Sequence, residues 1–234
     1  MADTIRLLSA GAVQKMATDL AADFEAASGH KVELNFATAG AVKDRVAGGE
    51  KVDVVISSQS AIAALNKPGM FVPGSVTDLA STATGLFVRA GAPRPDISTP
   101  EKFKQALLAA KTFAYSDPAG GGTGGRLFVA VLDRLGIKDE IDRKTVFGKR
   151  GVEVVASVLD GRAEMGTTFV SEIVPHRGTQ VVGELPGDLR DINGYAAAVP
   201  GGSSVRDAAA AYIAFLIDPA TRPRWTAAGM TPAF

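Results

Sequence analysis

The amino-acid sequence predicts an α/β fold in which a mostly parallel sheet is flanked by helices. Short apolar runs alternate with longer segments whose apolar residues recur every three to four positions, which is the helical period. Glycines stand just past several of the helical segments, where they end helices. Three strand–turn–helix units follow one another in the first 65 residues, and this succession is typical of parallel strands joined by right-handed crossovers.

The first three units can be placed by their periodicity. In the first helical segment the apolar positions are 13, 16, 20 and 24, and Gly29 ends the segment. We expect strands at 5–8, 32–36 and 52–56, and helices at 13–27, at 41–47 and up to Leu65.

A change of pattern near Ser81 marks a second region. There Thr99 is expected to cap a helix that has Pro100 at its first position. A long glycine-rich loop at 116–125 interrupts the pattern. The further expected strands are 85–88, 113–115, 165–169, 181–182 and 195–199, and the further expected helices are 127–135, 151–160, 207–217 and 219–228.

Composition excludes several classes of protein. The chain has no cysteine and two histidines, His30 and His176, which argues against thiolate or multi-histidine metal sites. Its 25 basic residues balance 25 acidic ones, so it carries no electrostatic signature of a nucleic-acid or anionic-membrane partner. No apolar run approaches the roughly 20 residues that a bilayer requires. We therefore expect no metal, no cofactor and no nucleic-acid partner.

Four turns between strands and helices are rich in small, hydroxyl or glycine residues. They lie at 9–12, 38–40, 57–60 and 116–125. Each places backbone N–H groups at the start of a helix, where the helix dipole also favours negative charge. In open α/β sheets, ligands bind beyond the carboxyl ends of the strands, so the turns indicate a site for a small anion. The alternative is that each turn is small and polar for helix capping alone.

The run from Gly120 to Gly125 differs from the common nucleotide-binding loops. A P-loop requires Lys and then Ser or Thr after its last glycine, whereas Arg126 and Leu127 follow here. The dinucleotide pattern is matched only because nearly every residue is glycine. Arg126 could pair with a carboxylate or simply face solvent.

Catalytic constellations are sparse. No G-x-S-x-G elbow is present. His30 follows Gly29, which is expected to end a helix, and His176 lies in an expected loop. Asp117 and Glu172 are the acids nearest the expected site and are the only candidates for proton transfer, if the protein is an enzyme.

The order of these turns resembles the molybdate-binding-protein-like branch of the type II periplasmic solute-binding proteins, the substrate-binding components of ABC transporters. The segments that carry the resemblance run nearly from end to end. They are 5–12, 36–42, 52–58, 116–118, 166–169, 215–220 and 229–232.

This resemblance implies two lobes, each a mostly parallel sheet flanked by helices, with a ligand cleft between them. The first lobe would comprise 1–82 plus 195–234 and the second 83–194. The turns and the resemblance together imply ligand-binding residues Ser9, Gly11, Ala12, Thr38, Ala39, Gly40, Ser57, Ser58, Gly122, Thr123, Gly124, Arg126, Thr167, Thr168 and Phe169.

Departures from the family pattern bear on the ligand. Molybdate binders have Ser in the first and second turns and Tyr in the fourth segment; here the matching positions are Ala12, 38–40 and Phe169. With fewer hydroxyl groups in the site, a desolvated inorganic oxyanion would lack hydrogen-bond donors for some of its oxygens. The resemblance therefore implies capture of an organic di- or tricarboxylate, or a similar anion, for a transporter permease.

Two other functions stay open at this stage. One is isomerisation of an unsaturated polycarboxylate, as in aconitate isomerase, a member of the wider group that looks like an enzyme built on this same fold. The other is a cytoplasmic anion sensor. We expect a periplasmic monomer whose signal peptide has been removed, with a cytoplasmic location as the alternative.

Overall fold

The computed structural model describes residues 2–120 and 122–234, and Gly121 of the predicted glycine loop lies outside this part. The chain divides into two compact units. The first comprises Met1–Ser81 and Asn193–Phe234, and the second comprises Thr82–Ile192. The boundaries predicted from the sequence lie one or two residues away from these.

The sheet of the first unit begins with three parallel strands. They are β1 (Thr4–Ala10), β2 (Lys31–Ala37) and β3 (Val54–Ser58), in the order β2-β1-β3. β9 (Ile192–Ala198) runs antiparallel to β3, and the two-residue β10 (Thr231–Pro232) pairs with the start of β4 (Thr77–Arg89). The parallel arrangement predicted from the first 65 residues is confirmed.

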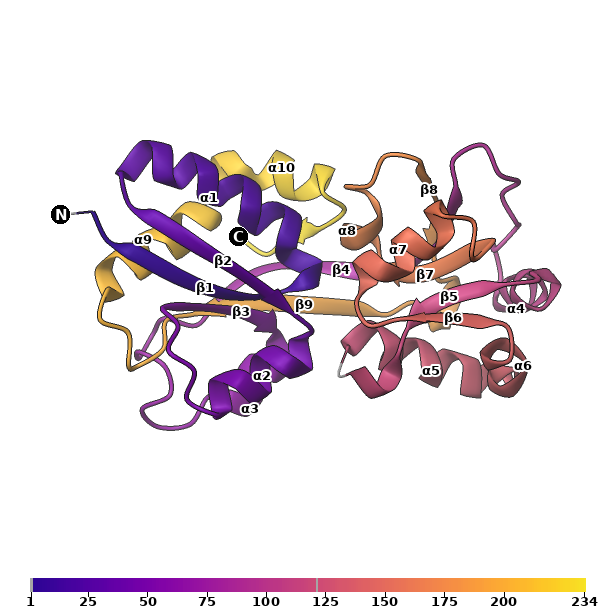
Figure 1. The fold of residues 1–234 in the computed structure, drawn as a ribbon, viewed down its shortest axis with the longest axis horizontal. Helices are drawn as coiled ribbons and strands as arrows, with labels where there is room; N and C mark the ends of the chain where they lie inside the picture. The colour runs from indigo at the N-terminus through magenta and orange to yellow at the C-terminus, as the bar shows by residue number, and fades with distance from the viewer. Residues whose placement is uncertain (1, 121) are drawn as a thin grey trace. The chain divides into compact units, whose positions relative to one another are not determined.

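Helices cover both faces of this sheet (Figure 1). α1 (Gln14–Ser28), α9 (Arg206–Leu216) and α10 (Arg222–Ala227) lie on one face, and α2 (Ala39–Ala47) and α3 (Gln59–Leu65) lie on the other. Short 3-10 turns, Gly11–Val13 and Pro219–Thr221, precede α1 and α10. Every residue of β3 is buried, as expected for a strand covered on both sides.

The second unit has its own parallel strands. β5 (Phe113–Ser116) lies between β7 (Met165–Phe169) and β6 (Thr145–Gly148) and is parallel to both. The later part of β4 runs antiparallel to β7 and to β8 (Thr179–Glu184). Each unit therefore combines three parallel strands with antiparallel neighbours.

The helices of the second unit also form two layers (Figure 1). α4 (Pro100–Ala109), α5 (Thr123–Leu135) and α6 (Lys138–Asp142) share one face with an aromatic core that includes Phe103, Phe113, Tyr115 and Phe128. α7 (Gly151–Leu159) and α8 (Val170–Ile173) lie on the other face. Two 3-10 turns, Pro118–Gly120 and Gly187–Leu189, complete the described elements of this unit.

Local signals placed several elements correctly, while short segments were missed. Thr99 caps α4 as predicted, with Oγ1 accepting a hydrogen bond of 3.2 Å from the Lys102 amide. The prediction that the glycine-rich loop extends to residue 125 was wrong, because α5 already begins at Thr123. The strand expected at 85–88 spans Thr77–Arg89, and neither α6 nor β6 was predicted.

Candidate functional site

In the first unit, the three predicted turns lie at one edge of the sheet. Ala10 is opposite Ala37 and Ser9 is opposite Ile56, so β1, β2 and β3 end at similar heights. A helical turn or helix begins directly after each strand. The structure therefore places these predicted residues along one edge: Ser9, Gly11, Ala12, Thr38, Ala39, Gly40, Ser57 and Ser58.

The hydroxyl groups of this edge have partners within the protein. Thr38 Oγ1 accepts from the Ala41 amide at 3.2 Å, and Ser58 Oγ accepts from the Ala61 amide at 3.3 Å. These two side chains cap α2 and α3, which is the structural alternative that the sequence left open. Ser9 and Ser57 are fully buried, and each donates to a backbone carbonyl.

The turn after β1 is built differently. Its N-cap is Ala10, which has no side chain able to cap the 3-10 turn Gly11–Val13. A helical start without a polar cap leaves its first backbone N–H groups to another acceptor. The peptide groups around Gly11 and Ala12 are therefore candidate donors to an anion at this edge.

In the second unit, β5, β6 and β7 also end at one edge, and α5, α7 and α8 begin there. The N-cap of α5 is Gly122, which again offers no capping side chain, and the first turn of α5 contains no acidic residue. A Cβ on Gly124 would lie 3.4 Å from the ring of Phe169. Gly124, predicted from one segment, thus lies beside Phe169, predicted from another.

The backbone at the start of α5 packs so closely that position 125 requires glycine. A Cβ at position 125 would lie 2.2 Å from the carbonyl oxygen of Ser116 and 3.2 Å from the backbone nitrogen of Pro118. The first turn of α5 is thereby held tightly against the end of β5. Arg126, the next residue, is exposed.

Asp117 has a structural role in the turn that leads to α5. Its amide donates to the Gly148 carbonyl at 2.8 Å, and its Oδ1 accepts from the Ala119 amide at 2.9 Å. This is the pattern of an Asp-stabilised turn. The role accounts for Asp117 without proton transfer.

Glu172, the other predicted acid, lies against the start of α7. Thr168 Oγ1 donates to Glu172 Oε2 at 2.5 Å. A Cβ on Gly151 would lie 2.0 Å from that same oxygen, so the carboxyl group rests directly on the glycine backbone. Burial raises the pKa of Glu172 above its ordinary value, against the opposing effects of hydrogen bonds from Thr168 and the Phe169 backbone and of the Arg150 charge.

Replacing Glu172 by glutamine is expected to raise the melting temperature at pH 7–8. A carboxyl group with a raised folded-state pKa holds its proton to higher pH than in the unfolded chain, so its ionisation lowers stability as the pH rises through that pKa. The neutral amide removes this loss, worth about 2–4 °C in Tm for each kcal/mol relieved. Thermal denaturation at pH 5 and pH 8 measures it, with the exposed Glu140→Gln as the control. A Glu172→Gln protein that melts below wild type at pH 8 but not at pH 5 would contradict this account.

The start of α7 is the part of the edge that sequence reasoning missed. Arg150 precedes Gly151 there, and its guanidinium lies 3.7 Å from Glu153. The missed strand β6 was the cause, because Lys149 to Gly151 could not be identified as a turn after a strand. Thr167, which was predicted, is buried, and its Oγ1 has no hydrogen-bond partner among the described residues.

No helix in residues 2–120 and 122–234 is both long and apolar enough to cross a bilayer. In the same residues, no three His, Cys, Asp or Glu side chains are grouped so that they could hold a metal ion.

Solved structures share this fold. The periplasmic molybdate-binding protein of Azotobacter vinelandii superposes with a TM-score of 0.78 at 18% identity, over 97% of this chain and 98% of its own. The protein AgtB of A. tumefaciens R10, solved in complex with agropinic acid, gives a TM-score of 0.72 at 19% identity, over 99% of this chain and 83% of its own. Such neighbours are two-lobed periplasmic binding proteins, which confirms the predicted fold class.

Sequence similarity to known proteins also extends over most of the chain. A curated relative, an aconitate isomerase of Pseudomonas sp., is 31% identical over 221 residues, covering 91% of this chain and 82% of the relative. The model of one protein family matches residues 5–231. The chain thus belongs to the bacterial extracellular solute-binding proteins, as the resemblance to the molybdate-binding-like branch predicted.

Proposed function

We propose that this protein captures a small organic di- or tricarboxylate and delivers it to the permease of an ABC-type transporter. The observation that carries the proposal is the start of α5, where an N-terminus capped only by glycine lies beside the Phe169 ring. Backbone N–H groups suit carboxylate oxygens, and an aromatic ring suits the carbon skeleton between them. An organic acid presents both surfaces, whereas an inorganic oxyanion presents only oxygen.

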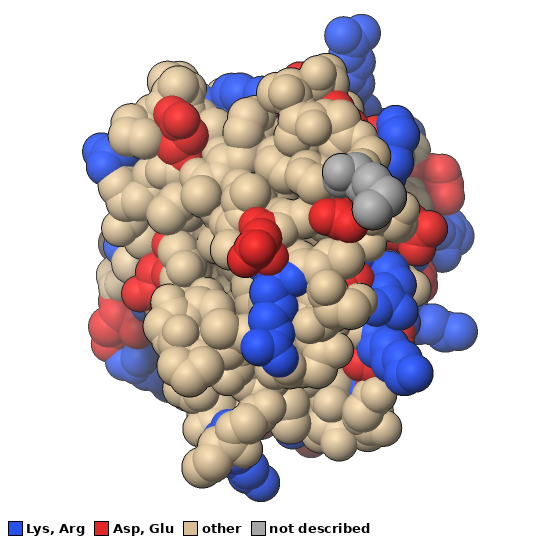
Figure 2. Space-filling view, turned by 90° about the vertical axis from the view of Figure 1, so that its left-hand side faces the viewer, with Lys and Arg blue, Asp and Glu red and all other residues tan. Residues whose placement is uncertain are grey.

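The charge distribution bears on how an anion would be held. The chain has no net charge, and Figure 2 shows acidic and basic side chains interspersed over one face of the molecule. A bound anion must therefore be held by local donors rather than by a global field. The proposed donors are the peptide groups near Gly11 and Thr123, together with Arg126 and Arg150.

The same residues argue against molybdate. Ala12 and Phe169 stand where the family resemblance expects Ser and Tyr, and Ser9 and Ser57 are buried. A desolvated oxyanion that loses such donors loses about 1–3 kcal/mol for each unmet group. The neighbour AgtB binds the organic agropinic acid, and the 31% identical relative acts on aconitate, a tricarboxylate.

Several finer expectations belong to this proposal. The ligand-binding residues that the family resemblance implies belong to both units. The protein would act as a monomer in the periplasm, without a metal or cofactor. The remaining proposed contacts are Thr38, Ala39, Gly40, Ser58, Gly122, Gly124 and Thr168.

Thermal denaturation with a panel of anions tests the proposal. Tricarballylate, citrate or trans-aconitate is expected to raise Tm progressively with concentration, as mass action requires, while molybdate and sulfate do not. Replacing Arg126 by glutamine should weaken the effective acid about tenfold, the value of one charge-assisted pair. The exposed Arg143→Gln is the matched control. Stabilisation by molybdate alone, or by none of these acids, would refute the proposal.

A second candidate function is the isomerisation of an unsaturated polycarboxylate. The aconitate isomerase relative favours it, as does Glu172, a carboxyl group of raised pKa in the unit that contains α5. Moving a double bond requires a base to remove a proton from one carbon and an acid to return one elsewhere. Glu172 is the proposed base of this reaction.

Absorbance of cis- and trans-aconitate incubated with the protein separates the two functions. Interconversion that Glu172→Gln abolishes, while Glu140→Gln does not, supports the isomerase. Binding of either isomer without interconversion supports the transport protein alone.

A further inference from the structure

A concave site lies in the second unit, at the edge of the sheet away from the start of α5. β4 and β7 are antiparallel, with Val88 opposite Met165, so the end of β4 meets the start of β7. The start of β5 lies at the same edge, because Phe113 is also opposite Met165. The cavity there has a volume of about 400 Å³, which falls within the range of small-molecule sites.

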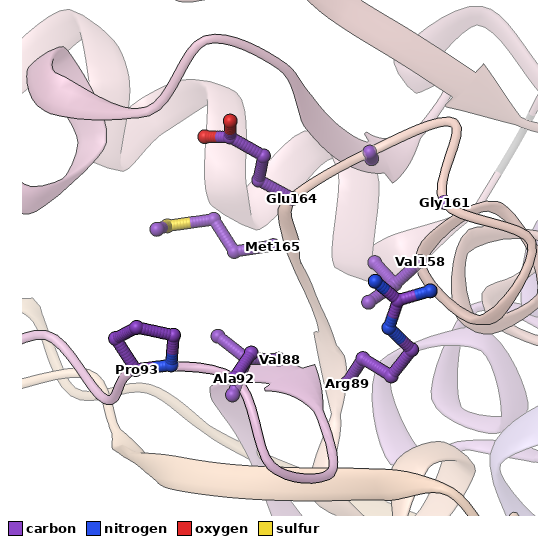
Figure 3. Close-up of a pocket in the computed structure, with 9 residues that line it drawn as sticks. Val88, Arg89, Ala92, Pro93, Val158, Gly161, Glu164 and Met165 are labelled. Atoms are coloured by element: carbon purple, nitrogen blue, oxygen red, sulfur yellow. The ribbon is translucent and has the colours of Figure 1, made fainter.

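Most of the lining is apolar. Val88, Val158 and Ala163 are buried, Met165 is half-buried, and Ala92 and Pro93 come from the loop after β4. In Figure 3, Pro93, Ala92 and Val88 lie along one side of the hollow, and Glu164 and Met165 lie along the opposite side. These walls suit a hydrocarbon chain or ring.

Two charged residues line the cavity, and they differ in their partners. Glu164 Oε2 accepts a hydrogen bond of 2.9 Å from the Lys111 amide. The guanidinium of Arg89 forms no hydrogen bond or ion pair with any residue in the described part of the chain, whereas the Arg89 backbone carbonyl accepts a hydrogen bond of 3.0 Å from the Ala92 amide. Arg89 Nη1 lies 3.7 Å from the position that a Cβ of Gly161 would occupy, just beyond α7. The cavity therefore offers one unpaired guanidinium at the end of an apolar wall.

We propose that this cavity binds a small monocarboxylic acid with an apolar body. The carboxylate pairs with Arg89, whose planar guanidinium matches two carboxylate oxygens, and the hydrocarbon packs on Val88, Ala92 and Met165. A phosphate or a tricarboxylate would bring further negative charge against apolar walls and Glu164, without a second cation among the lining residues. The site is separate from the proposed tricarboxylate site at α5.

Isothermal titration of the full chain with hexanoate tests this site. Wild type is expected to bind hexanoate saturably and to bind the uncharged hexanamide at least tenfold more weakly. Arg89→Gln should lose at least tenfold in hexanoate affinity. Arg94→Gln is the matched control, because Arg94 lies in the adjoining loop, is exposed and donates to the Val182 carbonyl instead. Its hexanoate affinity should equal that of wild type.

A second variant checks the apolar wall. Ala92→Phe fills the cavity from an exposed loop and should also remove hexanoate binding, while both variants keep the wild-type response to tricarballylate. The proposal is overturned if wild type shows no saturable hexanoate binding, if Arg89→Gln binds as tightly as Arg94→Gln, or if Ala92→Phe leaves the affinity unchanged. Loss of tricarballylate binding in Arg89→Gln would equally contradict a separate site.

Discussion

Replacing Asp53 by alanine is expected to lower the free energy of unfolding by about 3 kcal/mol. The Asp53 side chain is fully buried directly before β3. It accepts hydrogen bonds from Arg6 Nε at 2.9 Å, the Arg6 amide at 3.0 Å and Ser203 Oγ at 2.9 Å. Alanine leaves these donors without their acceptor. Arg6 is 43% exposed, so its charge can reach water, which keeps the loss below that of a fully buried pair.

The pH dependence identifies the mechanism. Burial alone would raise the pKa of Asp53, but the hydrogen bonds from Arg6 and Ser203 hold it below the ordinary value. The stabilisation is therefore complete above the ordinary carboxyl pKa and is lost as the pH falls through the depressed one. Urea denaturation at pH 7 and near pH 3 should show that the Asp53→Ala deficit shrinks in acid. The control is Asp44→Ala on the exposed surface of α2, and a deficit that stays constant with pH would contradict the account.

Replacing Gly125 by alanine should weaken tricarboxylate binding at least tenfold and lower stability by about 1–3 kcal/mol. The new methyl group would lie 2.2 Å from the Ser116 carbonyl oxygen, so the first turn of α5 must move away from β5. This movement displaces the backbone donors on which the proposed site depends. Calorimetric titration with tricarballylate and thermal denaturation measure the two effects.

The matched control for that change is Gly120→Ala in the same glycine-rich run. A Cβ at position 120 would make an ordinary contact of 3.7 Å with the Lys149 carbonyl oxygen. The Gly120→Ala protein should therefore bind and unfold like wild type. If Gly125→Ala binds tricarballylate as wild type does, the start of α5 is not part of the site.

The overall fold could be predicted because its signals are local. Glycines at 29, 136 and 161 adopt the positive φ angles that end helices, and Thr99 caps α4. Helical and strand periods placed β1, β2, β3 and β7 with small errors at their ends. β6 was missed because it is four residues long and exposes Phe147, so its pattern differs from that of a buried strand.

The candidate site could be predicted only in part. The small and polar residues at the turns predicted which sheet edges carry the candidate site, because in both units a helix begins soon after each parallel strand ends. Which hydroxyl groups cap helices, and which are buried, depends on neighbouring strands that the local pattern does not specify. The contact of Glu172 with Gly151 and that of Gly124 with Phe169 join distant segments. No local period encodes them.

Amide chemical shifts of isotope-labelled protein titrated with tricarballylate test the central claim most directly. The account predicts saturable shifts at the backbone N–H groups of Thr123, Gly124 and Gly125, together with those of Gly11 and Ala12, and little change on adding molybdate. Saturable shifts that leave these five amides unperturbed, or a response to molybdate alone, would contradict it.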